Sequence, residues 1–447
     1  MKRNFLEIKE KIKDFNKIIF VDGDKSISIR WALIASQATG ISKAKNLLLS
    51  EDVLNTLSCL KRLGVKISLN KNFCQITGRG VNGFIFKKNI ILNAGNSGTL
   101  GRLILPLLIK SPYKIKLIGD KSLSKRDFSR VTEPLKEFGV NFYPNNAKNL
   151  PLYIKGTNYL RPIKYLEKKG SAQCKSSVMF ASIFTPGITE IVAKKSRDHT
   201  EIMFENLKIP MRIKKKKDYD LISISKTNFI PNMNMNIPGD ISSSAFFIVL
   251  TLLLKRSKLI IKNVNINPSR IGIIKILNKM GAGIKLLNIR KNNNEKCADI
   301  YVKSKKNFKR INCPTKLNSS AIDEFLIIFL VAAKAKGIST FKNLSELNKK
   351  ESPRLKIASN FLNMIGIKTI SDNDSIKIYG KPNLNLNNKF KVKNFMKDHR
   401  VFMMSVIAGL SFGGDWKIYD PDSVNTSFPS FLNIIKKLGG KLNWKIK

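Results

Sequence analysis

The sequence predicts an α/β protein, of the mixed α+β kind, with two globular domains that each contain three strand-helix-strand-helix-hairpin repeats. Three observations lead to this prediction. Helix-like apolar segments end at glycine-containing stops with regular spacing, alternating β-branched segments follow the stops, and polar Gly- or Ser-rich segments precede further apolar helices. One such repeat cannot bury both faces of its sheet alone, so several must pack together.

The first sign of a repeat is the spacing of the predicted helix ends, because glycine after a helical pattern is typical of the left-handed C-terminal cap. Gly64 and Gly139 lie 75 residues apart, Gly366 and Gly439 lie 73 apart, and 142 residues separate Gly139 from Gly281. The last interval is about two periods. We therefore expect a missing copy near residues 207–210, after a helix that begins around residue 198.

The segments after the stops, such as 65–77, 209–225 and 367–379, alternate in the manner of paired strands. About 40 residues before each stop, a polar segment opens another apolar helix. Six such helix N-termini present free backbone N–H groups and a positive dipole end, which suits anions, although each alone could be an ordinary N-cap. The six starts are 23–26, 96–99, 171–173, 238–240, 319–323 and 398–400.

Six repeats divide into two domains of three. We expect one domain to span residues 22–239. The other is expected to combine residues 1–21 with residues 240–447, so that the N-terminal segment joins the C-terminal half of the chain.

The charge balance is strongly basic, with 81 Lys and Arg against 31 Asp and Glu, a formal net charge of +50. Such a charge is compatible with nucleic-acid binding. However, lysine outnumbers arginine 65 to 16, and Asn and Ile are abundant, as A/T-rich codons would produce. The lysines are spread along the chain and no recognition motif accompanies them. We therefore expect no nucleic-acid partner.

Composition also indicates the cellular compartment in which the protein is expected. No apolar run of about 18 residues is present, so a transmembrane helix and a membrane partner are not expected. The first 17 residues are charged throughout, which argues against a secretion signal. Five cysteines form no CxxC pair, which argues against disulfides and zinc and favours a reducing cytoplasm.

Arginines are informative in a chain where lysine is so common, because only arginine offers a planar, two-pronged donor. Several of the 16 arginines lie inside Gly-, Ser- or Asn-rich motifs, and both histidines lie in Arg-Asp-His or Asp-His-Arg triplets. This clustering is the first functional indication. The residues are Arg30, Arg102, Arg126, Arg197, Arg354, Arg400, His199 and His399.

Together these motifs resemble those of the enolpyruvyl transferase family, in particular the members that act on shikimate 3-phosphate. The resemblance is collinear from about residue 17 to the C-terminus. The segments 171–173 and 196–201 are similar to the sequence variant found in one bacterial branch of the family. The other matching segments are 23–30, 95–102, 119–126, 322–324, 350–355, 398–400 and 427–429.

The resemblance implies an inside-out α/β barrel fold with the active site in the cleft between the domains. It also implies transfer of the enolpyruvyl group of phosphoenolpyruvate to the 5-hydroxyl of shikimate 3-phosphate, by addition and elimination with release of phosphate. This reaction belongs to the shikimate pathway to chorismate and aromatic amino acids. Similar enzymes use no metal and no cofactor, and a monomer is expected.

The resemblance also assigns roles. Shikimate 3-phosphate would be held by Lys25, Ser26, Arg30, Ser171, Ala172, Gln173, Arg197, Asp323 and Lys350. Phosphoenolpyruvate would be held by Lys25, Asn96, Gly98, Arg126, Gln173, Arg354 and Arg400. The catalytic candidates are Asp323 as the base toward the 5-hydroxyl, and Glu351 and Lys25 for proton transfer at the methylene carbon. Bidentate arginines suit carboxylates and phosphates, which fits these assignments.

Several of the residues singled out have a simpler alternative. Asp323 precedes an apolar helix and could be a helix-start carboxylate. Lys350 and Glu351 could be a solvated pair. The two histidines could hold loops by hydrogen bonds, and Cys174 could be a packed small residue.

Three positions depart from the family pattern. Asp127 replaces a proline, which predicts a less rigid, more acidic loop. Pro353 replaces an aspartate, which is tolerable in a first helical turn but removes an anchoring carboxylate. Thr426 replaces a lysine that contacts phosphoenolpyruvate in many relatives.

Two rival functions remain open at this stage. The transferase that acts on UDP-N-acetylglucosamine shares the architecture, but it normally carries a loop cysteine that residues 120–128 lack. A basic nucleic-acid-binding protein, or a cyclase of RNA ends built from similar repeats, would show strongly salt-dependent polyanion binding.

Overall fold

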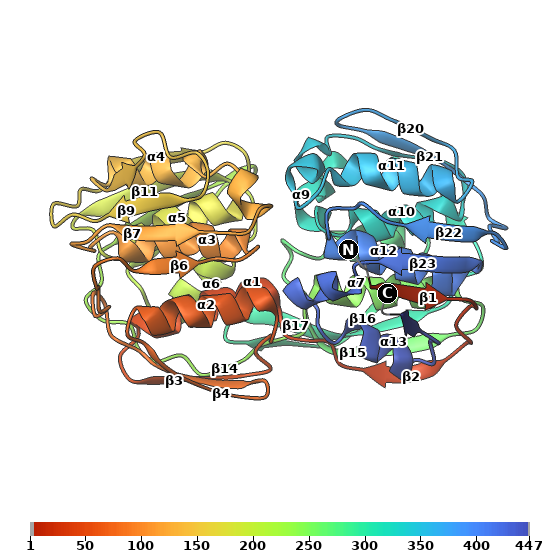
Figure 1. Cartoon of the computed structure of the whole chain (residues 1–447), viewed down its shortest axis with the longest axis horizontal. Coiled ribbons are helices and arrows are strands. Elements are labelled where there is room, and N and C mark those ends of the chain that lie inside the picture. The colour runs from red at the N-terminus through yellow and green to blue at the C-terminus, as the bar shows by residue number, and fades with distance from the viewer. Residues whose placement is uncertain (1–3, 446–447) are drawn as a thin grey trace. The chain divides into compact units, whose positions relative to one another are not determined.

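The computed structural model describes residues 4–445, and their contacts separate into two compact units (Figure 1). Unit 1 comprises residues 4–22, 238–290 and 296–445. Unit 2 comprises Gly23–Ile237 together with the short segment Lys291–Glu295. Each unit has its own apolar core.

Unit 2 contains three four-stranded sheets, with orders β14-β3-β5-β4, β6-β7-β9-β8 and β10-β11-β13-β12. In each sheet the first two strands are parallel and the others are antiparallel. The same sheet arrangement therefore occurs three times, although the first sheet takes its outer strand, β14, from the C-terminal end of the unit's main segment. The elements are α1 (Lys25–Gln37), β3 (Ile41–Lys45), α2 (Glu51–Arg62), β4 (Lys66–Asn70), β5 (Phe73–Thr77), β6 (Ile91–Asn93), α3 (Gly98–Ile104), β7 (Ile115–Ile118), α4 (Ser129–Glu137), β8 (Asn141–Tyr143), β9 (Leu152–Lys155), β10 (Lys164–Glu167), α5 (Ala172–Ser182), β11 (Ile188–Lys194), α6 (His199–Asn206), β12 (Met211–Lys215), β13 (Tyr219–Ser225) and β14 (Met235–Asn236).

Unit 1 repeats this plan with sheets β16-β17-β15-β2, β18-β19-β21-β20 and β22-β23-β1-β24. The N-terminal strands β1 and β2, red in Figure 1, complete two of these sheets. The elements are β1 (Phe5–Ile8), β2 (Asn16–Ile19), α7 (Ile241–Leu253), β15 (Lys258–Asn265), α8 (Gly272–Lys279), β16 (Lys285–Asn292), β17 (Glu295–Lys303), β18 (Phe308–Lys309), α9 (Asn318–Ala321), α10 (Phe325–Ala333), β19 (Ala335–Phe341), α11 (Arg354–Met364), β20 (Thr369–Ser371), β21 (Ile376–Gly380), β22 (Lys389–Val392), α12 (His399–Phe412), β23 (Asp415–Tyr419), α13 (Phe431–Lys437) and β24 (Asn443–Lys445).

Short 3₁₀ helices complete the connections between these elements. Two belong to unit 2 and three to unit 1. They are η1 (Leu105–Leu108), η2 (Leu123–Lys125), η3 (Thr315–Leu317), η4 (Ser345–Lys349) and η5 (Pro421–Thr426).

Three helices occupy the centre of each unit: α1, α3 and α5 in unit 2, and α7, α10 and α12 in unit 1. Every residue of α7 and of α10 is buried, and in α12 only Arg400 is not fully buried. Helices that are apolar on all sides must be enclosed by other elements, since no face is suited to water. The predicted fold class is confirmed.

The helix boundaries follow the sequence rules that predicted them. The predicted stops Gly64, Gly139, Gly281, Gly366 and Gly439 all have φ between +78° and +102°, the left-handed region in which glycine is favoured. The sixth helix of this kind, α6, has no glycine stop and ends at Asn206. Two residues later, Lys208 takes the left-handed conformation with φ of 54°. Five of the six predicted starts carry a side-chain cap, made by Asp24, Ser97, Ser171, Asp240 and Asp398.

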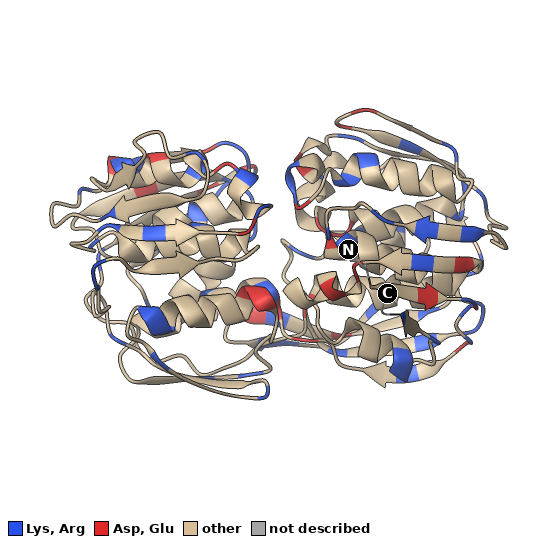
Figure 2. Ribbon diagram, viewed as in Figure 1, with Lys and Arg blue, Asp and Glu red and all other residues tan. Residues whose placement is uncertain are grey.

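Basic residues occur on elements of both units rather than on one segment (Figure 2). Within residues 4–445, no helix combines the length and the apolar character that crossing a membrane requires.

The buried N-caps provide a stability prediction with a matched control. Ser97 is fully buried and its Oγ accepts a hydrogen bond from the Leu100 amide (3.2 Å). Ser50 is also fully buried at an N-cap, but its Oγ caps nothing and has no hydrogen-bond partner in the described chain. We expect Ser97→Ala to lower the free energy of unfolding by about 1 kcal/mol.

By contrast, Ser50→Ala should leave the free energy of unfolding unchanged or raise it slightly, because it removes an unsatisfied buried hydroxyl. Urea unfolding curves of both variants would measure the difference. Equal losses for the two serines would show that the cap hydrogen bond is not the cause.

Candidate active site

The predicted site residues form two groups, one in each unit, and most lie at the N-terminal ends of the central helices or just before them. Unit 2 holds Lys25, Ser26, Arg30, Asn96, Gly98, Arg126, Ser171, Ala172, Gln173 and Arg197. Unit 1 holds Asp323, Lys350, Glu351, Arg354 and Arg400.

The first turn of α1 positions Lys25. Asp24 caps the helix by accepting a hydrogen bond from the Ile27 amide (3.0 Å). Lys25 follows directly, and its Nζ lies 2.9 Å from Asp52 Oδ2 on α2. The Lys25 side chain is 22% exposed. The ammonium group is therefore held near the helix N-terminus while part of it stays accessible to a ligand.

Arg30 lies one turn further along α1 and is almost fully buried, at 3% exposure. Its Nε donates to Thr200 Oγ1 on α6 (2.9 Å), and its terminal nitrogens donate to Ser176 Oγ on α5 (3.2 Å) and to the Ser26 carbonyl (3.2 Å). The hydroxyls of Ser176 and Thr200 lie 2.7 Å apart. Arg30 thus ties the N-terminal halves of α1, α5 and α6 into one polar network.

Asn96, Gly98 and Arg126 meet at the start of α3. A terminal nitrogen of Arg126 donates to Asn96 Oδ1 (3.2 Å), and Asn96 Nδ2 donates to Asp120 Oδ2 (2.6 Å). A Cβ at Gly98 would lie 3.0 Å from a terminal nitrogen of Arg126 and 3.0 Å from one of Arg102. The absence of a side chain at Gly98 therefore leaves room for two guanidinium groups.

Arg102 connects this group to α5. It donates to Gln173 Oε1 (2.8 Å) and to the Asp127 carbonyl (3.0 Å), and its guanidinium lies 5.1 Å from the centre of the Phe128 ring. Gln173 Nε2 in turn donates to Thr99 Oγ1 (3.0 Å). The amide of Gln173 is therefore held in one orientation.

Arg354 is the most buried cation in the unit 1 group, at 1% exposure. It donates to both carboxylate oxygens of Asp398 (2.9 and 3.2 Å) and also pairs with Glu351. Burial opposes its charge, but the facing carboxylates of Asp398 and Glu351 outweigh burial and raise the pKa of Arg354. Asp398 also accepts from Ser352 Oγ (2.8 Å) and caps α12.

Asp323 lies between α9 and α10, and its carboxylate faces cations. Lys350 Nζ is 3.2 Å from Asp323 Oδ1, and an Arg354 nitrogen is 3.5 Å from the same oxygen. Asp323 does not cap α10, whose N-cap residue is Glu324. Lys350 and Glu351 pair with Asp323 and Arg354 respectively. Lys350 and Glu351 therefore pair with other residues and not with each other, whereas Asp323, one position before the N-cap of α10, is compatible with both a helix-start role and a role as a base.

Arg400, in the first turn of α12, donates to the Asp323 carbonyl (2.9 Å) and lies 4.0 Å from a carboxylate oxygen of Glu324. His399 Nδ1 lies 3.3 Å from Thr426 Oγ1. Thr426 also donates to the Ser423 carbonyl (2.9 Å). At this departure from the family pattern, threonine thus contributes to loop structure.

The other two departures also have a structural basis. The Asp127 carboxylate accepts hydrogen bonds from the amide (2.8 Å) and hydroxyl (2.5 Å) of Ser129. Burial acts in the opposite direction, but these hydrogen bonds and the neighbouring arginines lower the pKa of Asp127. Hydrogen bonds therefore hold a loop that was expected to be less rigid. Pro353 is the N-cap residue of α11, just before the first turn.

Cys174 is buried at 2% exposure, and burial raises the pKa of its thiol. Both facts fit the alternative of a packed small residue, because a reactive cysteine needs access and a lowered pKa.

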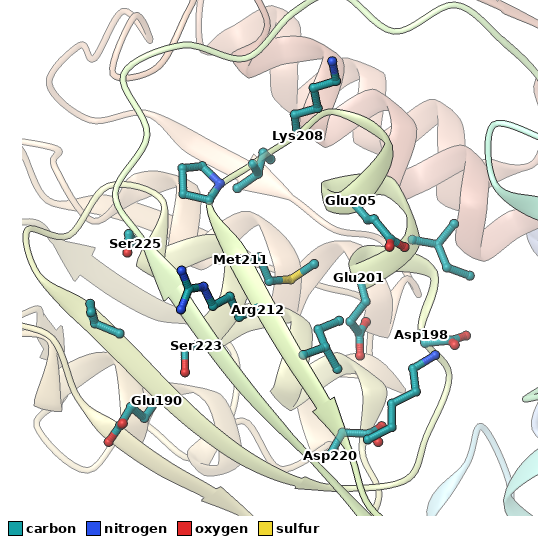
Figure 3. A pocket seen from close by; sticks show the side chains of 16 residues that line it. Glu190, Asp198, Glu201, Glu205, Lys208, Met211, Arg212, Asp220, Ser223 and Ser225 are labelled. Carbon is teal, nitrogen blue, oxygen red and sulfur yellow. The ribbon is translucent and has the colours of Figure 1, made fainter.

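A cavity of about 1000 Å³ opens elsewhere in unit 2, between α6 and strands β12 and β13 (Figure 3). Its lining includes five carboxylates, Glu190, Asp198, Glu201, Glu205 and Asp220, against three basic side chains. None of the predicted substrate-binding residues lines it. An excess of negative charge disfavours anions, so this cavity is not the candidate site.

Several partners of the site residues could not be identified from local sequence. Asp52, Ser176 and Glu295 have no motif of their own. Thr200, Arg102 and Asp398 lie inside motifs that resemble the family, but the resemblance assigns them no role. Within residues 4–445, no group of three or more His, Cys, Asp or Glu side chains could hold a metal ion.

The arrangement can bind anions and transfer protons. Unit 2 offers Lys25, Arg30, Arg126 and Arg197 near helix N-termini, which attract phosphate and carboxylate groups. Unit 1 offers two further arginines beside Asp323 and Glu351, two carboxylates that can accept or donate protons.

Comparison with known proteins agrees with this chemistry. The model of the family described as EPSP synthase (3-phosphoshikimate 1-carboxyvinyltransferase) matches residues 9–435. A 3-phosphoshikimate 1-carboxyvinyltransferase of Ruthia magnifica is 39% identical over 95% of each chain. A Thermoanaerobacter protein of the same name is 38% identical over 95% of this chain and 98% of its own.

Solved structures show the same similarity. The EPSP synthase of Acinetobacter baumannii superimposes with a TM-score of 0.87 at 31% identity, covering 99% of this chain and 100% of its own. The enolpyruvyl transferase NikO of Streptomyces tendae has a TM-score of 0.77 at 12% identity and covers both chains fully. The second similarity concerns the fold alone.

The Arg354–Asp398 pair leads to a prediction for stability and its pH dependence. Asp398→Asn removes the charge that faces the buried Arg354, so we expect the free energy of unfolding at pH 7 to fall by about 3–5 kcal/mol. Burial opposes the Asp398 charge, but Arg354 lowers the pKa of Asp398 in the folded protein. Its stabilisation is therefore complete above the unfolded carboxyl pKa of about 3.9 and is lost as pH falls through the lower folded value.

Urea unfolding at pH 7 and at pH 3 would measure this effect, with the exposed Asp415→Asn as the control. The difference between wild type and Asp398→Asn should shrink at the lower pH. A difference that is constant across this pH range would contradict the assignment.

Proposed function

This chain belongs to the EPSP synthase family, and from that membership we propose that its two groups of site residues bind shikimate 3-phosphate and phosphoenolpyruvate for a single transfer reaction. The enzyme transfers the enolpyruvyl group of phosphoenolpyruvate to the 5-hydroxyl of shikimate 3-phosphate and releases phosphate. This step leads to chorismate and the aromatic amino acids. The observation that carries the conclusion is the family match across residues 9–435.

The rival functions lack comparable support. Residues 120–128 contain no cysteine, unlike the loop of the enzyme that acts on UDP-N-acetylglucosamine. The curated relatives at 36–39% identity carry the name 3-phosphoshikimate 1-carboxyvinyltransferase. The basic charge is distributed over elements of both units and gives no specific reason to invoke nucleic acid.

For shikimate 3-phosphate, the proposal assigns the phosphate and hydroxyl groups to residues at the starts of α1, α5 and α6. These are Lys25, Ser26, Arg30, Ser171, Ala172, Gln173 and Arg197, with Asp323 and Lys350 supplied by unit 1. The support is the network of Arg30, Ser176 and Thr200, which links these three helix starts. Backbone N–H groups at the helix starts add to the attraction of a phosphate.

For phosphoenolpyruvate, the proposal assigns Lys25, Asn96, Gly98, Arg126 and Gln173 from unit 2 and Arg354 and Arg400 from unit 1. A carboxylate and a phosphate on one small molecule require several cations. The preorganised contacts of Arg126 with Asn96 and of Arg354 with Asp398 support this role, because fixed donors lose little freedom on binding.

The proton transfers are assigned to Asp323, Glu351 and Lys25. Asp323 accepts the proton of the 5-hydroxyl while the hydroxyl oxygen forms a bond to the central carbon of phosphoenolpyruvate. The methylene carbon gains a proton from Glu351 or Lys25, which produces a tetrahedral intermediate. That intermediate loses a methyl proton and expels phosphate, so the carbon-carbon double bond forms again. Nearby Lys350 and Arg354 stabilise the Asp323 carboxylate as the proton acceptor.

The direct test is release of inorganic phosphate in the presence of both substrates. Release should require shikimate 3-phosphate and phosphoenolpyruvate together, and neither alone should support it. Release from phosphoenolpyruvate with UDP-N-acetylglucosamine instead would favour the rival transferase. The proposal further holds that the enzyme is a cytoplasmic monomer, which sedimentation and cell fractionation would test.

Substitution of the proposed base separates chemistry from binding. Asp323→Asn keeps the shape of the side chain but cannot accept the hydroxyl proton, so we expect kcat to fall by roughly 100-fold or more. Calorimetry should find shikimate 3-phosphate still bound. The exposed Asp422→Asn serves as the control. A wild-type rate for Asp323→Asn would remove the base assignment.

Conservative substitutions test the arginine contacts. Arg126→Lys and Arg400→Lys keep the net charge but lose a two-pronged donor. A hydrogen bond to a charged group contributes about 1.5–3 kcal/mol, so kcat/KM for phosphoenolpyruvate should fall roughly 10- to 100-fold. The exposed Arg79→Lys and Arg310→Lys should leave it unchanged. If all four variants kept the wild-type kcat/KM for phosphoenolpyruvate, only the charge at these positions would matter.

A further inference from the structure

The tip of the β16–β17 hairpin belongs to unit 2, although most of both strands belong to unit 1. Three side chains of the tip make contacts within unit 2. Asn292 Nδ2 donates to the Asn236 carbonyl (2.5 Å), Asn293 Nδ2 donates to the Asn234 carbonyl (3.1 Å), and Glu295 Oε1 lies 2.6 Å from His199 Nδ1. The two asparagines attach the tip to the segment around β14.

The Glu295–His199 contact is fully buried, with both side chains at 0% exposure. Such a contact strongly constrains both groups, because loss of either partner leaves a buried polar group whose desolvation is no longer compensated. The two residues are 96 positions apart in the chain. Only the folding of the hairpin tip against α6 brings them together.

His199 is the first residue of α6 and follows Arg197 by two positions. The next residue, Thr200, accepts the hydrogen bond from Arg30 Nε and is in contact with Ser176. The first turn of α6 is therefore linked to Glu295 through His199 and to Arg30 through Thr200, and Arg197 precedes it directly in the chain. A shift of this turn would move both arginines relative to each other.

We propose that Glu295 is a positioning residue for shikimate 3-phosphate. It acts through His199, which fixes the first turn of α6 and thereby the relative positions of Arg197 and Arg30. This inference rests on the proposed function, because it assumes that these two arginines contact shikimate 3-phosphate. Arg126, Arg354 and Arg400, the arginines assigned to phosphoenolpyruvate, lie outside α1, α5 and α6, so phosphoenolpyruvate is expected to depend less on Glu295.

The first experiment compares Glu295→Gln with Lys296→Ala, an exposed neighbour on the same strand. Glu295→Gln removes the carboxylate charge from the hydrogen bond with His199, so calorimetry should find shikimate 3-phosphate bound about 10-fold more weakly. The KM for phosphoenolpyruvate at saturating shikimate 3-phosphate, and kcat, should change less than about 3-fold. Lys296→Ala should match the wild type in every measurement.

A double-mutant cycle tests whether Glu295 acts through His199. If it does, Glu295→Gln should cause no further loss of affinity once His199→Gln is present, since the two losses would share one origin. Additive losses would overturn the proposed route. Equal increases in both KM values together with a loss of stability would show a merely structural role and overturn the proposal.

The wild-type protein offers a further test, which needs no substitution and so does not depend on whether a variant folds. The chain has only two histidines, so the imidazole ¹⁵N resonances of His199 can be assigned against His399 by NMR. Shikimate 3-phosphate should shift the His199 resonances and phosphoenolpyruvate alone should not. The absence of any shift on saturation with shikimate 3-phosphate would overturn the proposal.

Failure of this inference differs from failure of the proposed function. If Glu295→Gln binds shikimate 3-phosphate normally while Arg197→Gln and Arg30→Gln do not, only the positioning role is wrong. If the two arginine variants also bind it normally, the assignment of the site itself is wrong.

Discussion

The structure depends on the burial of three helices at the centre of each unit. A buried helix start leaves backbone N–H groups that must find acceptors, and five of the six predicted starts meet this need with Asp or Ser caps. The same starts carry a positive dipole end. Polar and charged side chains are therefore required where the apolar core ends, and the repeat places such positions six times in the chain.

This constraint also explains why the basic site residues are so extensively paired. Arg30, Arg102 and Arg354 lie at or near the buried helix starts, where an uncompensated charge would be costly. Each has acceptors from a different element: Thr200 for Arg30, Gln173 for Arg102 and Asp398 for Arg354. These contacts fix the donors before a ligand arrives, and fixed donors are the source of electrostatic preorganisation in catalysis.

The parts of the molecule that were predictable from sequence are those encoded locally. Helix ends at Gly64 or Gly366 follow from one residue and its conformational freedom, and the cap at Asp398 follows from a short motif. The helix end near residue 207 follows from the repeat interval and not from a glycine, because Lys208 takes the left-handed conformation there. The pairing of Lys25 with Asp52, of Arg30 with Thr200 and of His199 with Glu295 depends on packing between distant elements. Local patterns carry no information about such contacts. Residues 291–295, for example, have no sequence pattern that distinguishes them from the rest of their hairpin.

The scarcity of acidic residues gives the remaining carboxylates added meaning. Only 31 of 447 residues are Asp or Glu, against 81 Lys and Arg, so most surface cations have no carboxylate available to pair with. Nevertheless Asp52, Asp323, Glu351 and Asp398 all face cations of the candidate site. A surface lysine is solvated by water and needs no partner, whereas a buried arginine does. A drift toward lysine can therefore proceed on the surface, but it cannot remove the carboxylates that keep buried arginines charged and in place.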